Sequence, residues 1–115
     1  MSSETPKIPQ DNRFYTLLRD RKIAEFNVYA ERGELSPDFT GLSFRGSDLR
    51  GLVASGLNFS NCKFKQADLR GINFSNTNLK GASLYGSKIS GCLFPQEIDA
   101  TEILMSLQHG TRLRY

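Results

Sequence analysis

The residues best suited to chemistry in this 115-residue chain are two cysteines, Cys62 and Cys92, and a single histidine, His109. The histidine has no serine, cysteine or carboxylate at a catalytic spacing, and its position at the end of a predicted helix suits a partner of the helix C-terminus. The three residues match no metal-binding motif. We therefore expect no catalytic residue, no metal site and no cofactor. We interpret the cysteines as small core residues without a disulfide, with a redox or metal role as the alternative.

The ten glycines are the next candidates, because glycine-rich loops can bind phosphate. They match neither GxGxxG before a helix nor a P-loop that ends in lysine. Instead, most of them recur at five-residue steps between Gly41 and Gly91. We interpret these glycines as corner residues, since glycine adopts the backbone angles that a tight turn requires.

Large apolar residues follow the same five-residue period. The column consists of Phe39, Phe44, Leu49, Ala54, Phe59, Phe64, Leu69, Phe74, Leu79, Leu84, Ile89 and Phe94. A small or apolar residue stands two positions before each member, and usually Gly or Asn stands two positions after it. A period of five fits neither a helix nor a strand, so the chain must turn at every fifth residue.

Four five-residue sides close a square coil of twenty residues, and each coil can stack on the next by parallel backbone pairing at ~4.8 Å. The twelve units from about residue 37 to 96 predict about three coils. The fold class expected from the repeat is therefore mainly β. Because a stack of coils has two open ends, we also expect caps at both ends.

The segments Ala67-Asp68-Leu69-Arg70-Gly71 and Ser47-Asp48-Leu49-Arg50-Gly51 resemble the A(D/N)LXX signature of the pentapeptide-repeat family, and residues 77–81 are a close variant. The resemblance implies a right-handed quadrilateral β-helix, a solenoid whose central residues point inward. Some members of that family bind DNA gyrase by imitating DNA, which requires a long and strongly acidic rod. A net charge of +3 and about three coils do not meet that requirement.

The flanks predict three parts in one domain: residues 1–36 as a disordered start and N-terminal helical cap, 37–96 as the β-helix, and 97–115 as a C-terminal helix with a basic tail. Apolar residues at three- and four-residue steps between residues 12 and 32, with a change of phase near Arg21, indicate two short helices. Asp99 and Glu102 have the spacing of an N-terminal cap. The helix that bears Ile103, Leu104 and Leu107 is expected to lie across the last coil.

Basic side chains form the one outward pattern of interest. Twenty-residue stacking places Arg45 over Lys65 and Arg50 over Arg70 on adjacent faces, and aspartates flank the second pair. The pattern fits either a solvated face of salt bridges or a surface for an acidic partner. The candidate partner-binding residues are Arg45, Arg50, Lys63, Lys65, Arg70, Arg112 and Arg114.

These observations favour a non-enzymatic protein-interaction or scaffold module whose partner is unknown. The alternative is weak binding of nucleic acid or another acidic partner through the basic face, and +3 is a small charge for a dedicated nucleic-acid binder. We expect a cytoplasmic protein without membrane contact, since the start is polar and no apolar run approaches ~20 residues. The C-terminal helix could seal a monomer or join a homodimer. The dimer is favoured because Met105 is also apolar.

Overall fold

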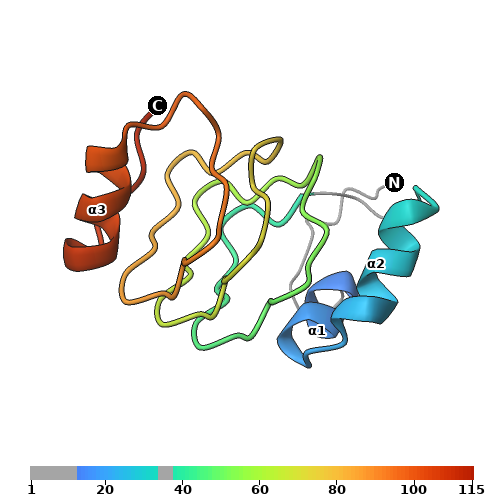
Figure 1. Ribbon diagram of the computed structural model, residues 1–115. Coiled ribbons are helices and arrows are strands. Elements are labelled where there is room, and N and C mark those ends of the chain that lie inside the picture. Colours follow the sequence, from blue (N-terminus) through green and yellow to red (C-terminus); the bar gives the residue numbers. More distant parts are fainter. Residues whose placement is uncertain (1–12, 34–37) are drawn as a thin grey trace, which may run out of the picture.

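The computed structural model describes residues 13–33 and 38–115, with helices at both ends of a coiled middle segment (Figure 1). Helices α1 (Arg13–Arg19) and α2 (Ile23–Glu31) precede the coil, and α3 (Ala100–His109) follows it. The two short N-terminal helices match the sequence prediction, and Arg21 between them has a left-handed φ of 63°. The predicted disordered start and the boundary at residue 37 lie outside the described residues.

The coil has a twenty-residue register. Each isolated parallel β-bridge joins residues twenty positions apart, as when Asp38 pairs with Asn58 and Asn58 with Asn78. This confirms the predicted stacking. The prediction of a mainly β protein holds only coarsely, because in residues 13–33 and 38–115 the bridges stay isolated and no longer strand forms. The chain turns after each short side, so pairing cannot extend.

Stacked sides form four faces, which we name by the residues at their centres. Face A has Phe39, Phe59 and Leu79; face B has Phe44, Phe64 and Leu84; face C has Leu49, Leu69 and Ile89; face D has Ala54, Phe74 and Phe94.

Most corners between the faces have left-handed backbone angles. Three corners lack glycine, at Asn61, Gln66 and Asn76, and the last of these is not left-handed. Asn61 and Gln66 have φ values of 60° and 58°. At the corner above Asn61, a Cβ on Gly81 would collide with the Asn61 side-chain oxygen. The asparagine and the glycine are therefore complementary in size, in addition to meeting the demand for positive φ.

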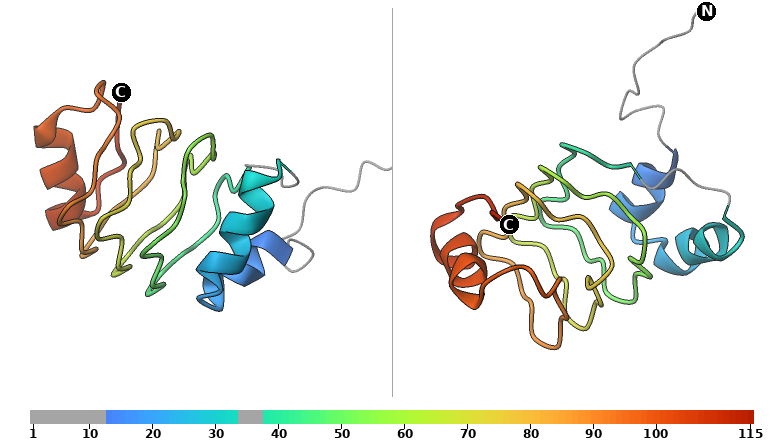
Figure 2. Two further views of the ribbon diagram at one scale, coloured as in Figure 1. Left: turned by 45° about the vertical axis from the view of Figure 1, so that its right-hand side comes forward. Right: turned by 90° about the horizontal axis from the view of Figure 1, so that it is seen from above.

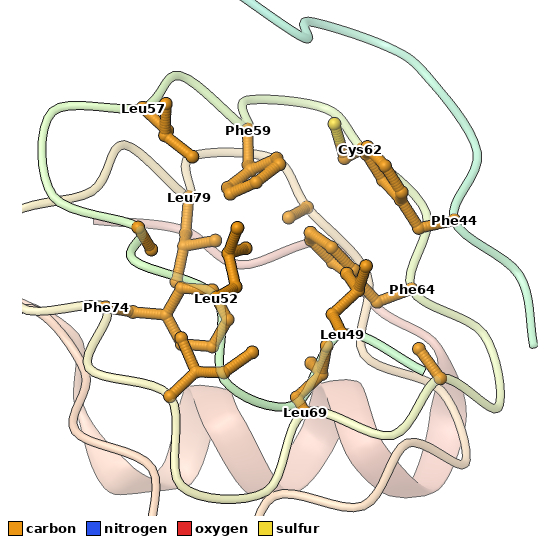
Figure 3. Close-up of a cluster of buried hydrophobic side chains, with 14 of the residues drawn as sticks. Phe44, Leu49, Leu52, Leu57, Phe59, Cys62, Phe64, Leu69, Phe74 and Leu79 are labelled. Carbon is orange, nitrogen blue, oxygen red and sulfur yellow. The ribbon is translucent and has the colours of Figure 1, made fainter. Parts of the chain in front are cut away.

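The core lies inside the coil, where the central side chains point toward one another (Figure 3). Rings on one face stack, with the centroids of Phe44 and Phe64 5.5 Å apart at an interplanar angle of 12°. Rings on neighbouring faces meet edge to face, as Phe59 and Phe64 do at 5.4 Å. Both arrangements are favourable for aromatic pairs. The interior is therefore a rigid support for the outward side chains.

Helices α1 and α2 lie beside the N-terminal end of the coil (Figure 2). Arg19 of α1 donates a hydrogen bond to the carbonyl of Arg45 at 2.7 Å. The side-chain amide of Asn27 in α2 donates to the carbonyl of Gly51 at 2.9 Å and accepts from the N–H of Val53 at 3.0 Å. These contacts satisfy backbone N–H and C=O groups of the first turn. In the interior of the coil, such groups pair with the neighbouring turn.

Helix α3 covers part of the opposite end. The Ser106 hydroxyl accepts a hydrogen bond from the N–H of Leu84 at 2.8 Å, and the carbonyl of Leu107 accepts one from Gly86 at 3.0 Å. The helix lies across this end as predicted, but the side chain of Leu104, one of its apolar residues, is 54% exposed. The fully buried residue of α3 is Ser106, which the apolar pattern did not indicate.

The N-terminal cap predicted for α3 does not form as expected. Asp99 occupies the N-cap position but makes no side-chain capping hydrogen bond. The Glu102 carboxylate instead binds the Arg114 guanidinium, with 2.8 Å between Oε2 and Nη2. Glu102 therefore binds Arg114, which is distant in the sequence, and the side-chain cap at Asp99 is absent.

The last residues pair with the coil as a further turn would. The N–H of Gly81 donates to the carbonyl of Leu113 at 2.8 Å, and the N–H of Leu113 donates to the carbonyl of Ala82 at 2.8 Å. The Leu113 side chain is buried. The tail is therefore packed down on the coil. Within the described residues, no helix has the length and apolar character needed to cross a membrane.

Candidate functional site

The two arginines of face C are paired with carboxylates. Arg50 Nη2 lies 2.7 Å from Asp48 Oδ2, and Arg70 Nη2 lies 2.7 Å from Asp68 Oδ2. Arg50 also contacts Asp68 at 3.4 Å between Nε and Oδ2, and Arg21 contacts Asp48 at 3.3 Å. The result is a continuous ladder of alternating charge along face C.

Hydrogen bonding in this ladder keeps the carboxylates ionised. The side-chain hydrogen bond from Arg50 lowers the pKa of Asp48 well below its usual value, and the bond from Arg70 lowers the pKa of Asp68. The arginine pKa values rise correspondingly, chiefly through the same hydrogen bonds. Face C therefore has the geometry of the salt-bridged alternative, and its arginines already have anionic partners.

Arg114 in the tail is also paired. Its guanidinium hydrogen bond lowers the pKa of Glu102 in α3, so both groups stay charged. This ion pair and the burial of Leu113 hold the tail against the coil. Of the seven candidate residues, Arg50, Arg70 and Arg114 are thus engaged within the chain.

Face B has a different charge pattern. Arg45, Lys63 and Lys65 are exposed, and none of the three has an ion pair among residues 13–33 and 38–115. The coil register places Lys63 between Ser43 and Ser83 on one ladder. No acidic residue flanks the central residues of this face, whose stacked triplets are residues 43–45, 63–65 and 83–85.

Face B is hollowed where it meets the C-terminal end of α3. The cavity has a volume of about 520 Å³. The residues that give it its character are Lys63, Lys65, Ser83, Tyr85, His109 and Arg112. Lys65 Nζ lies 5.7 Å from the centroid of the Tyr85 ring, which is within reach of a cation–π contact.

One wall of this cavity is formed by the C-terminal end of α3 and the turn at Gly110 that follows it. Gly110 ends the helix in a left-handed conformation, and the position of a Cβ there would lie 3.5 Å from Cβ of Tyr85. The Ser83 hydroxyl donates to the carbonyl of Gly110 at 3.1 Å. The turn directs the following residues back over the coil, so that Arg112 joins the two lysines. Lys63 and Arg112 are distant in the sequence and meet only because the tail returns.

The sequence prediction identified the three charged residues of this cavity but not the cavity itself. Arg112 was grouped with Arg114, although the structure gives only Arg114 an ion pair among the described residues. His109 was expected to serve the end of the helix, and it also lines the cavity. Tyr85 was the one sequence signal for this cavity, because it is an aromatic residue in the outward column of face B that Arg45 and Lys65 also occupy.

The cysteines belong to the core. Burial raises the pKa of Cys62 to about 12 and raises that of Cys92 as well. Each thiol donates to a backbone carbonyl at 2.9 Å, and neither forms a disulfide. A neutral buried thiol is a poor nucleophile and a poor metal ligand. In the part of the chain that the structure describes, no group of three His, Cys, Asp or Glu residues could hold a metal ion.

Comparison with protein families finds pentapeptide repeats in eight copies, over residues 37–66 and 58–94. The chain belongs to the pentapeptide-repeat family. The matched residues cover the coil and end where the connection to α3 begins, so they include Arg45, Lys63 and Lys65 but not Arg112. No curated protein and no solved structure matches this pentapeptide-repeat chain significantly. Membership therefore establishes a repeat protein with a β-helix type of fold, without a specific function.

Proposed function

We propose that this chain is a non-enzymatic protein-interaction module of the cytoplasm, and that face B is its docking surface for an acidic protein segment. In this proposal the coil is a right-handed quadrilateral helix of about three turns. The twenty-residue bridges support that architecture. The partner is defined by its chemistry, which is a run of Asp or Glu side chains.

The observation that carries the proposal is the contrast between two adjacent faces. Face C neutralises Arg50 and Arg70 with Asp48 and Asp68. Face B leaves Arg45, Lys63 and Lys65 without a carboxylate partner among the described residues. Uncompensated charge of one sign steers a complementary partner and orients it on the surface.

The stacked core makes this face rigid. Phe44, Phe64 and Leu84 lie beneath the charged residues and are fully or almost fully buried. Because the backbone that presents Arg45 and Lys65 is fixed by hydrogen bonds to neighbouring turns, little backbone order must be created on binding. A preorganised surface of this kind suits an extended acidic segment.

Nucleic-acid binding through the same residues is the second candidate. It is supported by the same free cations and by Arg112 nearby, but the pairing of Arg50, Arg70 and Arg114 leaves few charges to follow a phosphate backbone. Four phosphate contacts would give a slope of about −3.6 for log K against log salt on duplex DNA. We therefore favour the protein partner and treat nucleic acid as an outcome of the test.

The homodimer expected through α3 remains a prediction. Leu104 and Met105 are exposed on this helix, at 54% and 41%. Their exposure is compatible with a second copy, but it does not identify one.

Affinity purification from the native host tests the proposed function. The bait is the intact chain, compared with the double variant Arg45→Gln/Lys63→Gln and with Lys88→Gln, an exposed lysine of face C. We expect an acidic partner to be retained by the wild type and by Lys88→Gln but lost with the double variant. Equal retention by all three proteins, or recovery of nucleic acid with no protein partner, would refute the proposal.

A further inference from the structure

Three cationic side chains line the cavity at the C-terminal end of face B. Lys63 and Lys65 come from the coil, and Arg112 comes from the returning tail. No aspartate or glutamate lines the cavity, and none of the three has an ion pair among residues 13–33 and 38–115. The cavity therefore gathers positive charge without internal compensation, unlike face C.

Neutral polar groups add to these charges. Asn61 and Gln108 line the same cavity, and a side-chain amide can donate hydrogen bonds. The Ser83 hydroxyl directs its proton to the Gly110 carbonyl, so its donor is already used. The donors available to a ligand are thus the two ammonium groups, the guanidinium, the two amides and the His109 imidazole.

This set of donors suits a dianion with several oxygens. A phosphate group has up to two negative charges and three or four acceptor oxygens, whereas a carboxylate has one charge and two oxygens. Arginine binds two phosphate oxygens with its planar fork, and lysine contributes a mobile point charge. Three cations around one space exceed what a single carboxylate needs.

The size of the cavity allows the phosphate to be part of a larger molecule. About 520 Å³ lies within the range of small-ligand sites, which is ~300 to 1,000 Å³. The Tyr85 ring is 42% exposed and forms an apolar wall beside the charged groups. A ligand could therefore place its phosphate among the cations and its remaining atoms on the ring.

We infer that this cavity is a phosphate-binding site, formed by Lys63, Lys65 and Arg112, that accepts the phosphate free or esterified. The inference rests on the proposed function because the lysines also belong to face B. Two residues separate the proposals. Arg45 lies on face B but does not line the cavity, and Arg112 lines the cavity but lies outside the coil.

Titration with inorganic phosphate tests the site directly. Amide chemical shifts of the intact, isotopically labelled chain are followed at about pH 8, above the second pKa of inorganic phosphate, so that the dianion predominates. Sodium chloride of equal ionic strength is the reference. We expect saturable shifts at residues 63–65, 83–85 and 108–112. Shifts that chloride reproduces, or that never saturate, would overturn the inference.

Single substitutions then assign the binding residues. Arg112→Gln and Lys65→Gln should each weaken phosphate binding about tenfold, since each removes a charge-assisted hydrogen bond. Lys88→Gln is the matched control on face C, and it should change the affinity less than about twofold because an exposed distant charge is screened. Equal weakening by all three variants would mean a general charge effect and would contradict a built site.

The source of the phosphate is distinguished by a second titration. A phosphoserine peptide and its unphosphorylated form are compared with inorganic phosphate on the wild type and on Arg112→Gln. Tighter binding of the phosphopeptide identifies a modified protein segment, and tighter inorganic phosphate identifies a small ligand. Either result supports the site if Arg112→Gln weakens the binding of that ligand. Binding that Arg112→Gln leaves unchanged would overturn the inference.

Failure of this inference and failure of the proposed function give different results. Arg45→Gln should weaken capture of the protein partner and leave phosphate affinity unchanged within about twofold. Phosphate binding without a protein partner would leave the cavity assigned and the docking face refuted. If the chain does not bind phosphate but loses its protein partner with Arg45→Gln, the docking face is supported and the phosphate site is refuted.

Discussion

The hydroxyl of Tyr115 accepts a hydrogen bond from the backbone N–H of Leu79 at a distance of 2.7 Å. Tyr115 is the last residue of the chain, and Leu79 is the central residue of face A in the turn nearest α3. In the interior of the coil the same backbone position pairs with a carbonyl, as when Phe59 donates to Asn78 at 2.8 Å. A side chain of the tail thus replaces a backbone group of the next turn.

Removal of this contact should measure how much the tail stabilises the coil. Tyr115→Phe leaves the N–H of Leu79 without its partner, and we expect a loss of about 1 kcal/mol in the free energy of unfolding. A chain that ends at Gly110 also loses buried Leu113, so it should lose ~2 to 5 kcal/mol. Urea unfolding followed by circular dichroism measures both values. An unchanged midpoint in the shortened chain would show that the tail is not a cap.

The register of the core can be tested at two phenylalanines. Phe64 and Phe74 are 0% and 1% exposed, so replacing either with alanine should cost ~3 to 5 kcal/mol through lost burial and a cavity. Leu93 precedes Phe94 in the sequence but is 57% exposed, and Leu93→Ala should cost less than ~1 kcal/mol. Denaturant titration of the three variants provides the comparison. Similar costs at all three positions would contradict the register.

The corner formed by Asn61 and Gly81 predicts a non-additive pair. Gly41→Ala and Gly81→Ala both place a side chain at positive φ, but only the second meets a neighbouring atom, the Asn61 side-chain oxygen. We expect Gly81→Ala to be more destabilising by about 1 kcal/mol, because the Asn61 side chain must leave its present rotamer. Asn61→Gly should recover most of that difference. Additive effects in the double variant would show that the two residues do not interact.

Acid should destabilise the chain through its ion-paired carboxylates. Arginine hydrogen bonds depress the folded pKa values of Asp48, Asp68 and Glu102, so their stabilisation is present above the unfolded values of ~4. It is lost as the pH falls through the folded values. The free energy of unfolding should therefore decrease below about pH 4. Asp48→Asn/Asp68→Asn should reduce the steepness of that decrease, and an identical pH profile would contradict the assignment.

The sequence predicted the coil well because its determinants are local. A turn at every fifth residue is visible in Gly and Asn, and the apolar centres follow from the same count. Where Asn61 and Gln66 replace glycine, the period still predicted the corner correctly. The phase change at Arg21 likewise separated α1 from α2.

The C-terminal features depended on contacts that no local pattern specifies. Glu102 has the spacing of a capping residue, but Arg114 offers it a stronger charged partner after the tail returns. Ser106 is buried because its hydroxyl satisfies the N–H of Leu84, a role that apolar periodicity cannot indicate. The cavity was missed for the same reason, since Arg112 reaches the lysines only through the turn at Gly110.

The most direct measurement of the central claim is to map where an acidic segment binds. An aspartate- and glutamate-rich peptide is titrated into the labelled chain, and the amide shifts of faces B and C are compared. We expect shifts along face B, at residues 43–45, 63–65 and 83–85, that decrease with Arg45→Gln and with added salt. Shifts along face C at residues 48–50 and 68–70, or none that depend on Arg45, would contradict it.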